Sequence, residues 1–416
     1  MKILLCDDRD QQREEARQSL FQTLGPDHEI VAWDTDKLTK DVVSFFDKVK
    51  NLLNGTDSGP LESDFDGFDL ILLDNNLSAL AISGTRLTAE AIAGYLRAFS
   101  NSPYIISLNK NPYVDFDLRF LIGDYSTRSD FAAKTEHLSS RWLWFGDFGE
   151  PGSFQPWYWP TLATAPDQRR NQINFVQRNL DNPILPALGF SEASVRLLSR
   201  HAEGALSPSA GQGGDSHDKP PSSVTFREFF EFSNRSIPVK EDRDKLLAHK
   251  LDEVIARIVA AEIDVWLKRD VIGPQSALVD APHLLARMPF LLANKATDID
   301  AWNASARSRT PPFGFDQALY DKHIAAAVFS DECWAPKPLF WWSILEADDG
   351  LQSLLYEDGG EWGDFVFCED LSSFRPRKSE GGSPKEFAAE FEGEWNRRYV
   401  ALVDGFHYSP HSRFAL

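Results

Sequence analysis

Acidic residues that directly follow short apolar runs are the clearest chemical signal in the sequence. Asp7 and Asp8 follow the run KILLC at 2–6, and Asp74 closes the run DLILLD at 69–74. Such runs are typical of strands that are buried on both faces of a parallel sheet. Ligands of these sheets collect beyond the carboxyl ends of the strands, so neighbouring strands would bring the three carboxylates together. Carboxylates this close repel one another unless they hold a cation, and oxygen ligands suit Mg²⁺.

The elements that would position these acids alternate between strand and helix. Strands are predicted at 2–7, 29–33, 69–74, 103–108 and 120–126. Helices are predicted at 8–24, between the second strand and about Leu53, at 85–99 and at 129–142. This alternation predicts an α/β domain over residues 1–145, with a parallel sheet covered by helices on both faces. The segment 54–67 is rich in Gly, Asp and Ser, and we interpret it as an exposed insertion.

Residues 1–135 resemble the receiver domain of response regulators, which has a flavodoxin-like fold with a five-stranded parallel sheet. The resemblance rests on the adjacent acids Asp7 and Asp8 after the first strand and on Asp74 in LILLDNNLSALAISG. It implies that Asp74 is the phospho-acceptor. It also implies that Mg²⁺ is held by the carboxylates of Asp7, Asp8 and Asp74 and by the backbone carbonyl group of Asn76.

The other receiver positions are matched in part. Ser107 in PYIISLNK lies where the family places a Ser or Thr that hydrogen-bonds the phosphoryl group, and Gly84 resembles the glycine that opens the third helix. Counting on from Ser107, the family's lysine falls on Arg128, which is followed by serine instead of proline. A guanidinium group pairs with phosphate, but it does not replace an ammonium point charge. Lys110 and Lys134 are the alternatives if the alignment is shifted.

The acidic motifs also have a purely structural interpretation. Adjacent aspartates after a strand can cap the next helix, and an aspartate before Asn75 and Asn76 can form a strand end and a turn. Each motif alone favours this interpretation. Their occurrence together, in strand order and with Ser107 in place, favours the receiver-like fold.

The composition limits the classes of function. The 416 residues include 43 Lys plus Arg against 63 Asp plus Glu, a net charge of -20. A chain with this charge is repelled by a phosphate backbone, so we expect no nucleic-acid partner. Three scattered cysteines argue against a disulfide framework or a four-cysteine zinc site, and a reducing cytoplasm is the simplest compartment. No apolar run has the length of a membrane span.

The remainder of the chain is predicted to be mostly helical. A connector at 146–165, rich in Trp, Pro and Gly, leads into a helical effector or interaction domain at 166–416. The clearest helical pattern runs over 240–270, with further amphipathic stretches near 166–180, 191–205, 224–234 and 280–292. Residues 204–223 and 375–385 are expected to be flexible.

Catalytic signatures in this second half are weak. Cys333 with His323 nearby could form a thiol–imidazole pair, but a buried apolar cysteine is the commoner case. His407 and His411 have metal-ligand spacing without a nearby third ligand, and His283 is interpreted as a structural histidine. No motif of a hydrolase or of a nucleotide-binding loop is present in the sequence.

Two binding functions are also considered. The stretch 188–204 could form a DNA-recognition helix, but an ordinary buried amphipathic helix fits the acidic chain better. The stretch 338–350 is interpreted as a buried helix with a solvated acidic end. Several tryptophans exceed what a core normally takes and could anchor a protein partner: Trp157, Trp159, Trp334, Trp341, Trp342 and Trp362.

We therefore expect a cytoplasmic, signal-responsive regulator or adaptor of a prokaryote. Its receiver-like domain, with or without phosphorylation, would control a helical protein-interaction domain. The expected partner is a protein, either an upstream kinase or a subunit of a complex. The alternatives are a receiver-coupled effector enzyme and, less favoured by the charge, a DNA-binding regulator.

Overall fold

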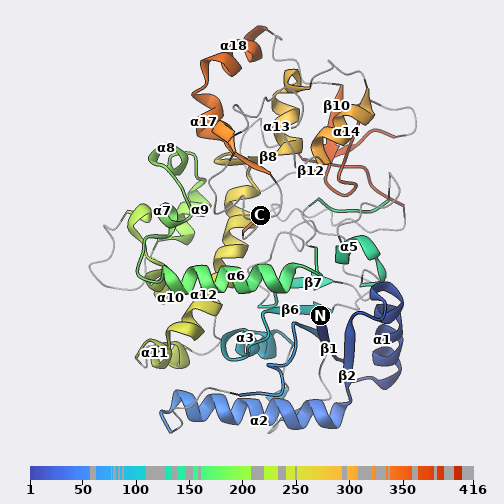
Figure 1. Cartoon of the computed structure of the whole chain (residues 1–416), viewed down its shortest axis with the longest axis vertical. Helices are drawn as coiled ribbons and strands as arrows, with labels where there is room; N and C mark the ends of the chain where they lie inside the picture. The colour runs from blue at the N-terminus through green and yellow to red at the C-terminus, as the bar shows by residue number, and fades with distance from the viewer. Residues whose placement is uncertain are drawn as a thin grey trace.

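The computed structural model of the chain describes most of the sequence in separate stretches. They are residues 1–56, 62–75, 77, 81–82, 85–86, 89–108, 128–133, 138–145, 153–157, 161–207, 220–232, 240–248, 251–292, 298–307, 321–324, 334–335, 338–357, 364–378, 382–387 and 398–404. In Figure 1 the N-terminal α/β region lies at the bottom and the C-terminal elements lie at the top.

A five-stranded parallel sheet forms the centre of the N-terminal region. Its strands are β1 (Lys2–Cys6), β2 (Glu29–Trp33), β3 (Leu70–Asp74), β6 (Tyr104–Leu108) and β7 (Phe131–Ala133). They are arranged in the order β2-β1-β3-β6-β7, and every pairing is parallel. Counted along the chain this is the order 2-1-3-4-5, which flavodoxin-like folds share. The predicted α/β architecture is confirmed.

The fifth strand is not where the sequence predicts it. Residues 120–126 lie outside the described residues, and β7 instead occupies part of the predicted closing helix at 129–142. Phe131 and Ala133 are buried and pair beside β6, with Phe131 opposite Ile106. Three residues are too few for a period to show in the sequence, and pairing with the neighbouring strand decides their conformation. The described part of the closing segment contains the short helix α5 (Arg141–Phe145).

Helices cover both faces of the sheet. On one face, Ile3, Leu5, Leu70, Leu72 and Ile106 share a buried cluster with α1 (Asp10–Leu24) and with Trp144 of α5. On the other face, Leu4, Cys6, Ile71, Leu73 and Ile105 share a cluster with α2 (Thr35–Leu53) and α3 (Ala89–Phe99). The strict alternation of side chains between the clusters is what a sheet buried on both faces requires. Gly25, with a φ of 80°, ends α1 in a conformation that favours glycine.

The predicted insertion at 54–67 is partly built into the core. Phe65 and Phe68 are buried, and the Phe65 ring lies 5.0 Å from the Trp33 ring and 5.7 Å from the Phe45 ring. The expectation of an exposed segment was wrong for Phe65, because burial of its aromatic ring outweighs the polar composition around it, whereas Phe68 directly follows the predicted insertion. The region before α3 contains a short hairpin, β4 (Ala81–Ile82) with β5 (Thr85–Arg86), where the sequence predicts the first turn of a helix.

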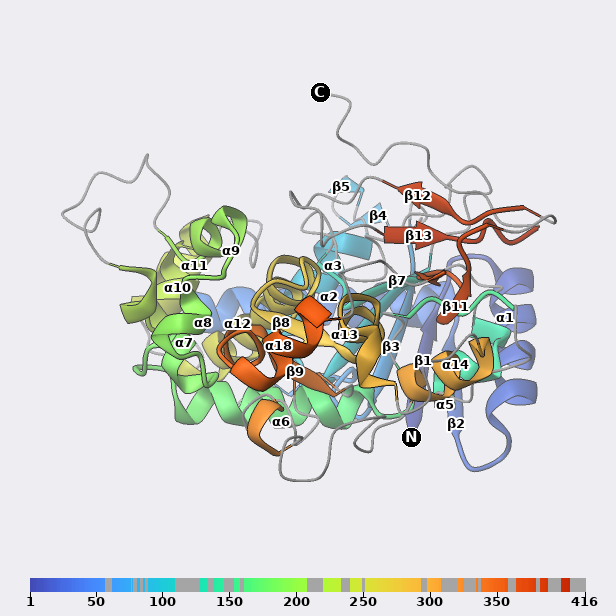
Figure 2. The same cartoon turned by 90° about the horizontal axis from the view of Figure 1, so that it is seen from above.

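The second half is a mixture of helices and small sheets. Its main helices are α6 (Ala165–Arg178), α10 (Phe226–Phe232), α11 (Lys240–Ala248), α12 (Asp252–Trp266), α13 (Ala281–Arg287), α14 (Ile299–Arg307) and α18 (Asp349–Glu357). A four-stranded sheet that the sequence did not predict joins β10 (Phe365–Cys368), β11 (Ser373–Pro376), β12 (Lys385–Phe387) and β13 (Arg398–Val400). Figure 2 shows this sheet and the helices α10 and α11 on opposite sides of α12 and α13.

Several predicted helices have different boundaries in the structure. The stretch 191–205 forms two short helices, α8 (Glu192–Val195) and α9 (Arg200–Ala205), because the Ser199 side chain caps α9. It therefore does not form the single recognition helix considered above. The stretch 338–350 begins with a strand, β9 (Leu339–Trp341), which pairs with β8 (Leu278–Asp280), and only then becomes the short helix α17 (Trp342–Glu346).

The two segments expected to be flexible have regular structure at their ends. Residues 204–205 belong to α9, 221–223 form a 3₁₀ helix, and 375–376 lie in β11. The middle portions, 208–219 and 379–381, lie outside the described residues. None of the helices in the described ranges is long and apolar enough to cross a membrane.

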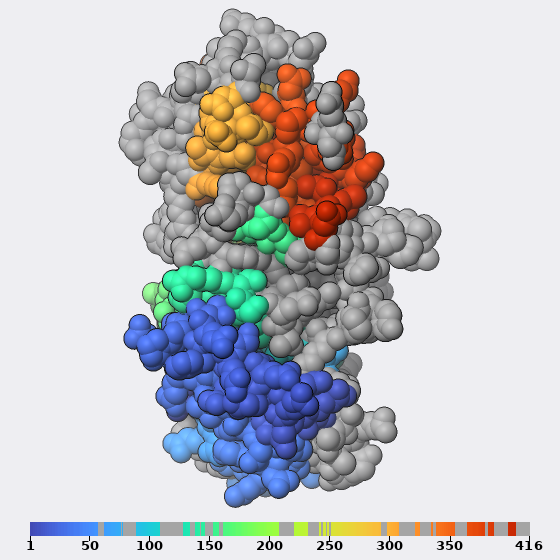
Figure 3. Space-filling model, turned by 90° about the vertical axis from the view of Figure 1, so that its right-hand side faces the viewer, coloured from blue at the N-terminus to red at the C-terminus, as the bar shows by residue number. Residues whose placement is uncertain are grey.

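One hydrophobic cluster spans the predicted domain boundary at 145. Leu73 of β3 and Ile92 of α3 belong to the same cluster as Ile255 and Ile258 of α12. The connector contributes to the other two clusters, with Phe154 beside the α1 face and Trp157 among the residues of α13 and β10. Figure 3 shows the first fifty residues at one end of the molecule and the orange and red segments at the other. The sheet therefore packs against the second half through a continuous core.

Candidate functional site

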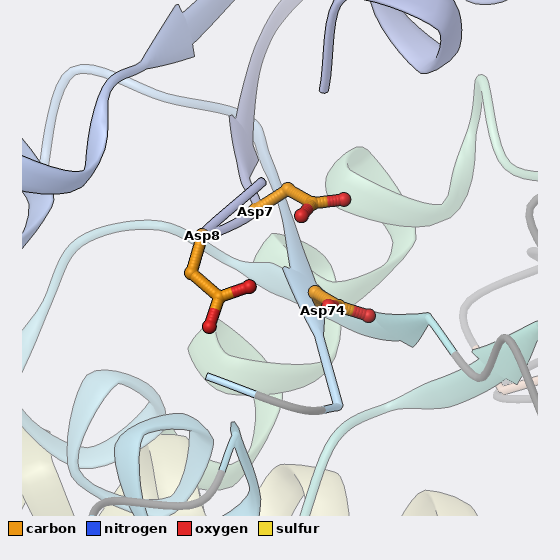
Figure 4. A group of neighbouring side chains, drawn as sticks. All are labelled: Asp7, Asp8 and Asp74. Carbon is orange, nitrogen blue, oxygen red and sulfur yellow. The ribbon is translucent and has the colours of Figure 1, made fainter. Parts of the chain in front are cut away.

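Three carboxylates gather at the carboxyl edge of the sheet. Asp7 and Asp8 directly follow β1, Asp74 ends the neighbouring strand β3, and one carboxylate oxygen of each lies within 4.8 Å of the others. Figure 4 shows the three side chains around one point at the ends of these strands. Asp7 and Asp74 are buried, with 0% and 4% of their surface exposed, whereas Asp8 is half-buried. The sequence therefore placed these three residues together correctly.

Local hydrogen bonds hold Asp7 in position. Its Oδ1 atom accepts the backbone N–H of Arg9 at 2.9 Å, and Arg13 donates to its backbone carbonyl oxygen at 2.9 Å. The Arg13 side chain also pairs with Asp10 at 2.5 Å, so this guanidinium group is held on the surface of α1. Asp7 therefore has a fixed side chain before any ligand binds.

The surroundings of the acids are of low polarity. Burial raises the pKa of the Cys6 thiol, and the charge of Asp7 raises it further. Cys6, one residue before the acids, is thus an apolar core residue and not a nucleophile. Coulomb repulsion between carboxylates is strong in such a region, and a bound divalent cation relieves it.

The donor set fits Mg²⁺. All three residues offer carboxylate oxygen atoms, and Mg²⁺ prefers a few carboxylates together with water molecules. The backbone carbonyl group of Asn76, the fourth ligand that the resemblance implies, lies outside the described residues, as does Gly84. Asp7, Asp8 and Asp74 could therefore hold a metal ion.

Ser107 lies one strand away from the acids and on the other face of the sheet. It pairs with Leu73, next to Asp74, but side chains alternate along a strand. The Ser107 side chain lies on the same face of the sheet as Ile105, which packs towards α3. Asp74 lies two residues after Leu72 and therefore on the opposite face, which packs towards α1. Its buried hydroxyl accepts a hydrogen bond from Ser129 at 3.0 Å.

Arg128 lies before β7 and beside α3. Its backbone N–H donates to Glu90 in the first turn of α3. Burial and the charge of Asp242 raise the pKa of Tyr95, and the charge of Arg128 acts against this rise. Arg128 therefore precedes the fifth strand, which runs from Phe131 to Ala133. The two alternatives, Lys110 and Lys134, lie outside the described residues.

A second polar cluster, which the sequence analysis did not identify, surrounds His283. The imidazole Nδ1 lies 2.5 Å from Asp280 and Nε2 lies 3.0 Å from Glu369, while Arg398 approaches both Glu369 and Nε2, at 2.9 and 2.6 Å. The indole N–H of Trp157 donates to Asp280 at 2.9 Å. All five residues are buried. Asp280 three residues before His283 marks a helix cap in the sequence, but Glu369 and Arg398 are too distant for any spacing to reveal.

The remaining candidates do not form a described site. His323 is buried and its Nε2 lies 3.2 Å from Asp348, whereas Cys333, His407 and His411 lie outside the described residues. Trp157, Trp334 and Trp341 belong to the core, so they do not form an exposed aromatic patch. Trp342 is half-buried and stacks against Arg287 at 4.8 Å, and Trp159 and Trp362 lie outside the described residues.

Comparisons with known proteins find no matching family model, no matching curated protein and no matching solved structure. The strand order and the acids at the ends of β1 and β3 are therefore the observations from which a function can be proposed.

Proposed function

We propose that the chain is a signal-responsive regulator whose receiver-like region binds Mg²⁺ and accepts a phosphoryl group on Asp74. The observation that carries this proposal is the convergence of Asp7, Asp8 and Asp74 within 4.8 Å at the carboxyl edge of a sheet with the order 2-1-3-4-5. Ligands of such sheets bind where the strand order reverses, which is between β1 and β3. The three acids stand at this point.

The chemistry assigned to Asp74 is a direct phosphoryl transfer. A carboxylate oxygen of Asp74 forms a bond to phosphorus, while the bond between phosphorus and the donor's leaving oxygen breaks and the leaving group keeps the electron pair. A bound Mg²⁺ supplies positive charge to the oxygen atoms of the phosphoryl group. Asp7, which is held by the N–H of Arg9, and Asp8 would keep that charge beside Asp74.

The core offers a route from the acids to the second half. The residues directly before the acids, Cys6 and Leu73, belong to the hydrophobic cluster that includes Ile255 and Ile258 of α12. A change in charge at Asp74 would shift the end of β3 and its packing against α3, which in turn contacts α12. The regulated surface would then be presented by the second half to a protein partner, such as an upstream kinase or a subunit of a complex.

Intact-mass measurement tests the proposal. Incubation with acetyl phosphate and Mg²⁺ is expected to add the mass of one phosphoryl group to the wild type, and to add nothing when EDTA replaces Mg²⁺. Asp74→Asn is expected to abolish the gain. Asp10→Asn is the matched control, since Asp10 is close in sequence but is exposed and paired with Arg13, and it is expected to retain the gain.

A regulator that works without phosphorylation is the second candidate. The position of Ser107 favours it, because its hydroxyl is bonded to Ser129 and belongs to the face opposite Asp74. This candidate predicts that Mg²⁺ raises the unfolding temperature of the wild type but not of Asp8→Asn, while acetyl phosphate adds no mass. Absence of both effects would contradict both candidates.

A further inference from the structure

A small cavity lined by three arginines lies at the edge of the sheet opposite the acids. Its volume is about 20 Å³, and its walls include Arg97 of α3, Arg169 of α6 and Arg257 of α12. The loop that contains Ser102, just before β6, completes it. No acidic residue is among the described residues that line it. The cavity wall therefore contains three guanidinium groups at the place where three helices from both halves of the chain meet.

Each arginine of the cavity wall pairs with a carboxylate, and the partner of Arg257 is Glu253. Asp130 pairs with both Arg97 at 2.8 Å and Arg169 at 3.0 Å, and Asp264 pairs with both Arg169 at 3.2 Å and Lys268 at 2.7 Å. This connected network contains three cations and two carboxylates, and one of the cations, Lys268, lies outside the cavity wall. Buried like charges are costly unless they are compensated, so an anion in the cavity would stabilise the network.

A buried hydroxyl group of the cavity wall offers a further donor. Ser102 is 4% exposed, and its Oγ atom has no hydrogen-bond partner within the described part of the chain. The buried Nε atom of Arg97 likewise has none among the described residues. Buried polar groups normally have partners, and a hydroxyl and a guanidinium N–H can both donate to an oxyanion. The two groups line the same cavity.

We propose that this cavity binds one small oxyanion of the phosphate type, held by Arg97, Arg169, Arg257 and Ser102. Arginine forks match the geometry of phosphate oxygens. The volume exceeds the roughly 10–15 Å³ that a water molecule needs but cannot accept a nucleotide. Because α6 and α12 belong to the second half, the anion would strengthen the contact between that half and the sheet. The proposal is independent of phosphorylation at Asp74.

Thermal unfolding with inorganic phosphate as the probe tests the site. EDTA is present and sodium chloride keeps the ionic strength constant. Phosphate is expected to raise the unfolding temperature of the wild type and of Asp74→Asn in a saturable manner, which separates this site from the acids. Arg257→Gln is expected to weaken the apparent affinity at least tenfold. Phenyl phosphate is expected to stabilise less than inorganic phosphate, because the ester group does not fit the cavity.

Two variants control for effects on folding. Ser102→Ala removes a hydroxyl that has no partner in the described residues, so it is expected to leave the unfolding temperature without phosphate undiminished and to weaken phosphate binding several-fold. Arg170→Gln makes the same charge change on α6 at a residue outside the cavity wall, which pairs with Asp69, and is expected to bind phosphate as the wild type does. A wild type that gains no stability from phosphate, or a Ser102→Ala that binds it unchanged, overturns the proposal.

Discussion

At the scale of single residues, His283 shows how a buried titratable group is held. Burial acts to lower the pKa of His283, and so does the charge of Arg398, but the charges of Asp280 and Glu369 outweigh both and raise it. The protonated imidazole is therefore favoured in the folded chain relative to the unfolded chain. Its stabilising contribution is complete below the unfolded pKa, near 6.5, and is lost as the pH rises through the folded value.

The first prediction concerns the pH dependence of this contribution. The free energy of unfolding of the wild type is expected to exceed that of His283→Gln by about 3 kcal/mol below pH 6.5, because the variant breaks a buried charged network. The difference is expected to shrink as the pH rises above 6.5, and urea unfolding at a series of pH values measures it. His323→Gln is the opposite control, since burial lowers the pKa of His323 and its difference should shrink as the pH falls below 6.5. If the stability differences of the two variants changed with pH in the same way, the assignment of a raised pKa to His283 would be contradicted.

At the scale of elements, α6 fastens the amino edge of the sheet to α12. Arg169 of α6 bonds both Asp130, next to β7, and Asp264 of α12. Gln172, one turn along α6, donates to Asp264 at 3.0 Å. Although burial acts to raise the pKa of Asp264, the charges of Lys268 and Arg169 lower it. The network thus replaces the solvation that these buried groups lose.

Removal of Arg169 is therefore expected to be costly. Arg169→Met removes one cationic partner from each of two buried carboxylates, Asp130 and Asp264. We therefore expect the free energy of unfolding to fall by about 3–5 kcal/mol. Arg170→Met is the matched control, because Arg170 is 43% exposed and exposed ion pairs contribute about 0–1 kcal/mol. Chemical unfolding followed by tryptophan fluorescence measures both. A loss below 1 kcal/mol for Arg169→Met would show that the network does not support the fold.

The elements that could be predicted from the sequence are those with a strong local pattern. Residues 2–6 and 70–74 are apolar runs that can only be central strands, and their positions bring Asp7, Asp8 and Asp74 together. The three residues of β7 carry no such pattern, so the fifth strand was predicted at 120–126 instead of at Phe131–Ala133. The His283 cluster depends on Glu369 and Arg398, which only the tertiary fold brings near. Long-range pairing is thus what the sequence alone could not supply.

At the scale of the whole molecule, the two halves share one core. Ile258 of α12 is 1% exposed and belongs to the cluster that contains Leu4, Leu73 and Ile105 of the sheet. Helix α3, which covers this face of the sheet and contacts α12, would expose apolar surface to water if the second half were absent. The halves are therefore expected to unfold together.

Substitution within α12 tests this coupling. Ile258→Ala is expected to lower the free energy of unfolding by about 2–5 kcal/mol, and to increase the rate of hydrogen exchange in β3 and β6 as well as in α12. Phe21→Ala is the control, since Phe21 is 53% exposed on α1 and its loss should change stability by about 0.5 kcal/mol at most. Faster exchange in α12 alone, or two separate unfolding transitions, would show that the halves are independent.

The shared cluster also limits how this chain can be recombined. A sensor domain with a polar surface can be fused to many different effector domains, because each domain keeps its own hydrophobic core. Here α3, which covers one side of the sheet, packs against α12, which lies more than a hundred residues beyond the sheet in sequence. A chimera that keeps residues 1–145 must therefore supply a new apolar helix in the place of α12, and a simple fusion at the connector would aggregate.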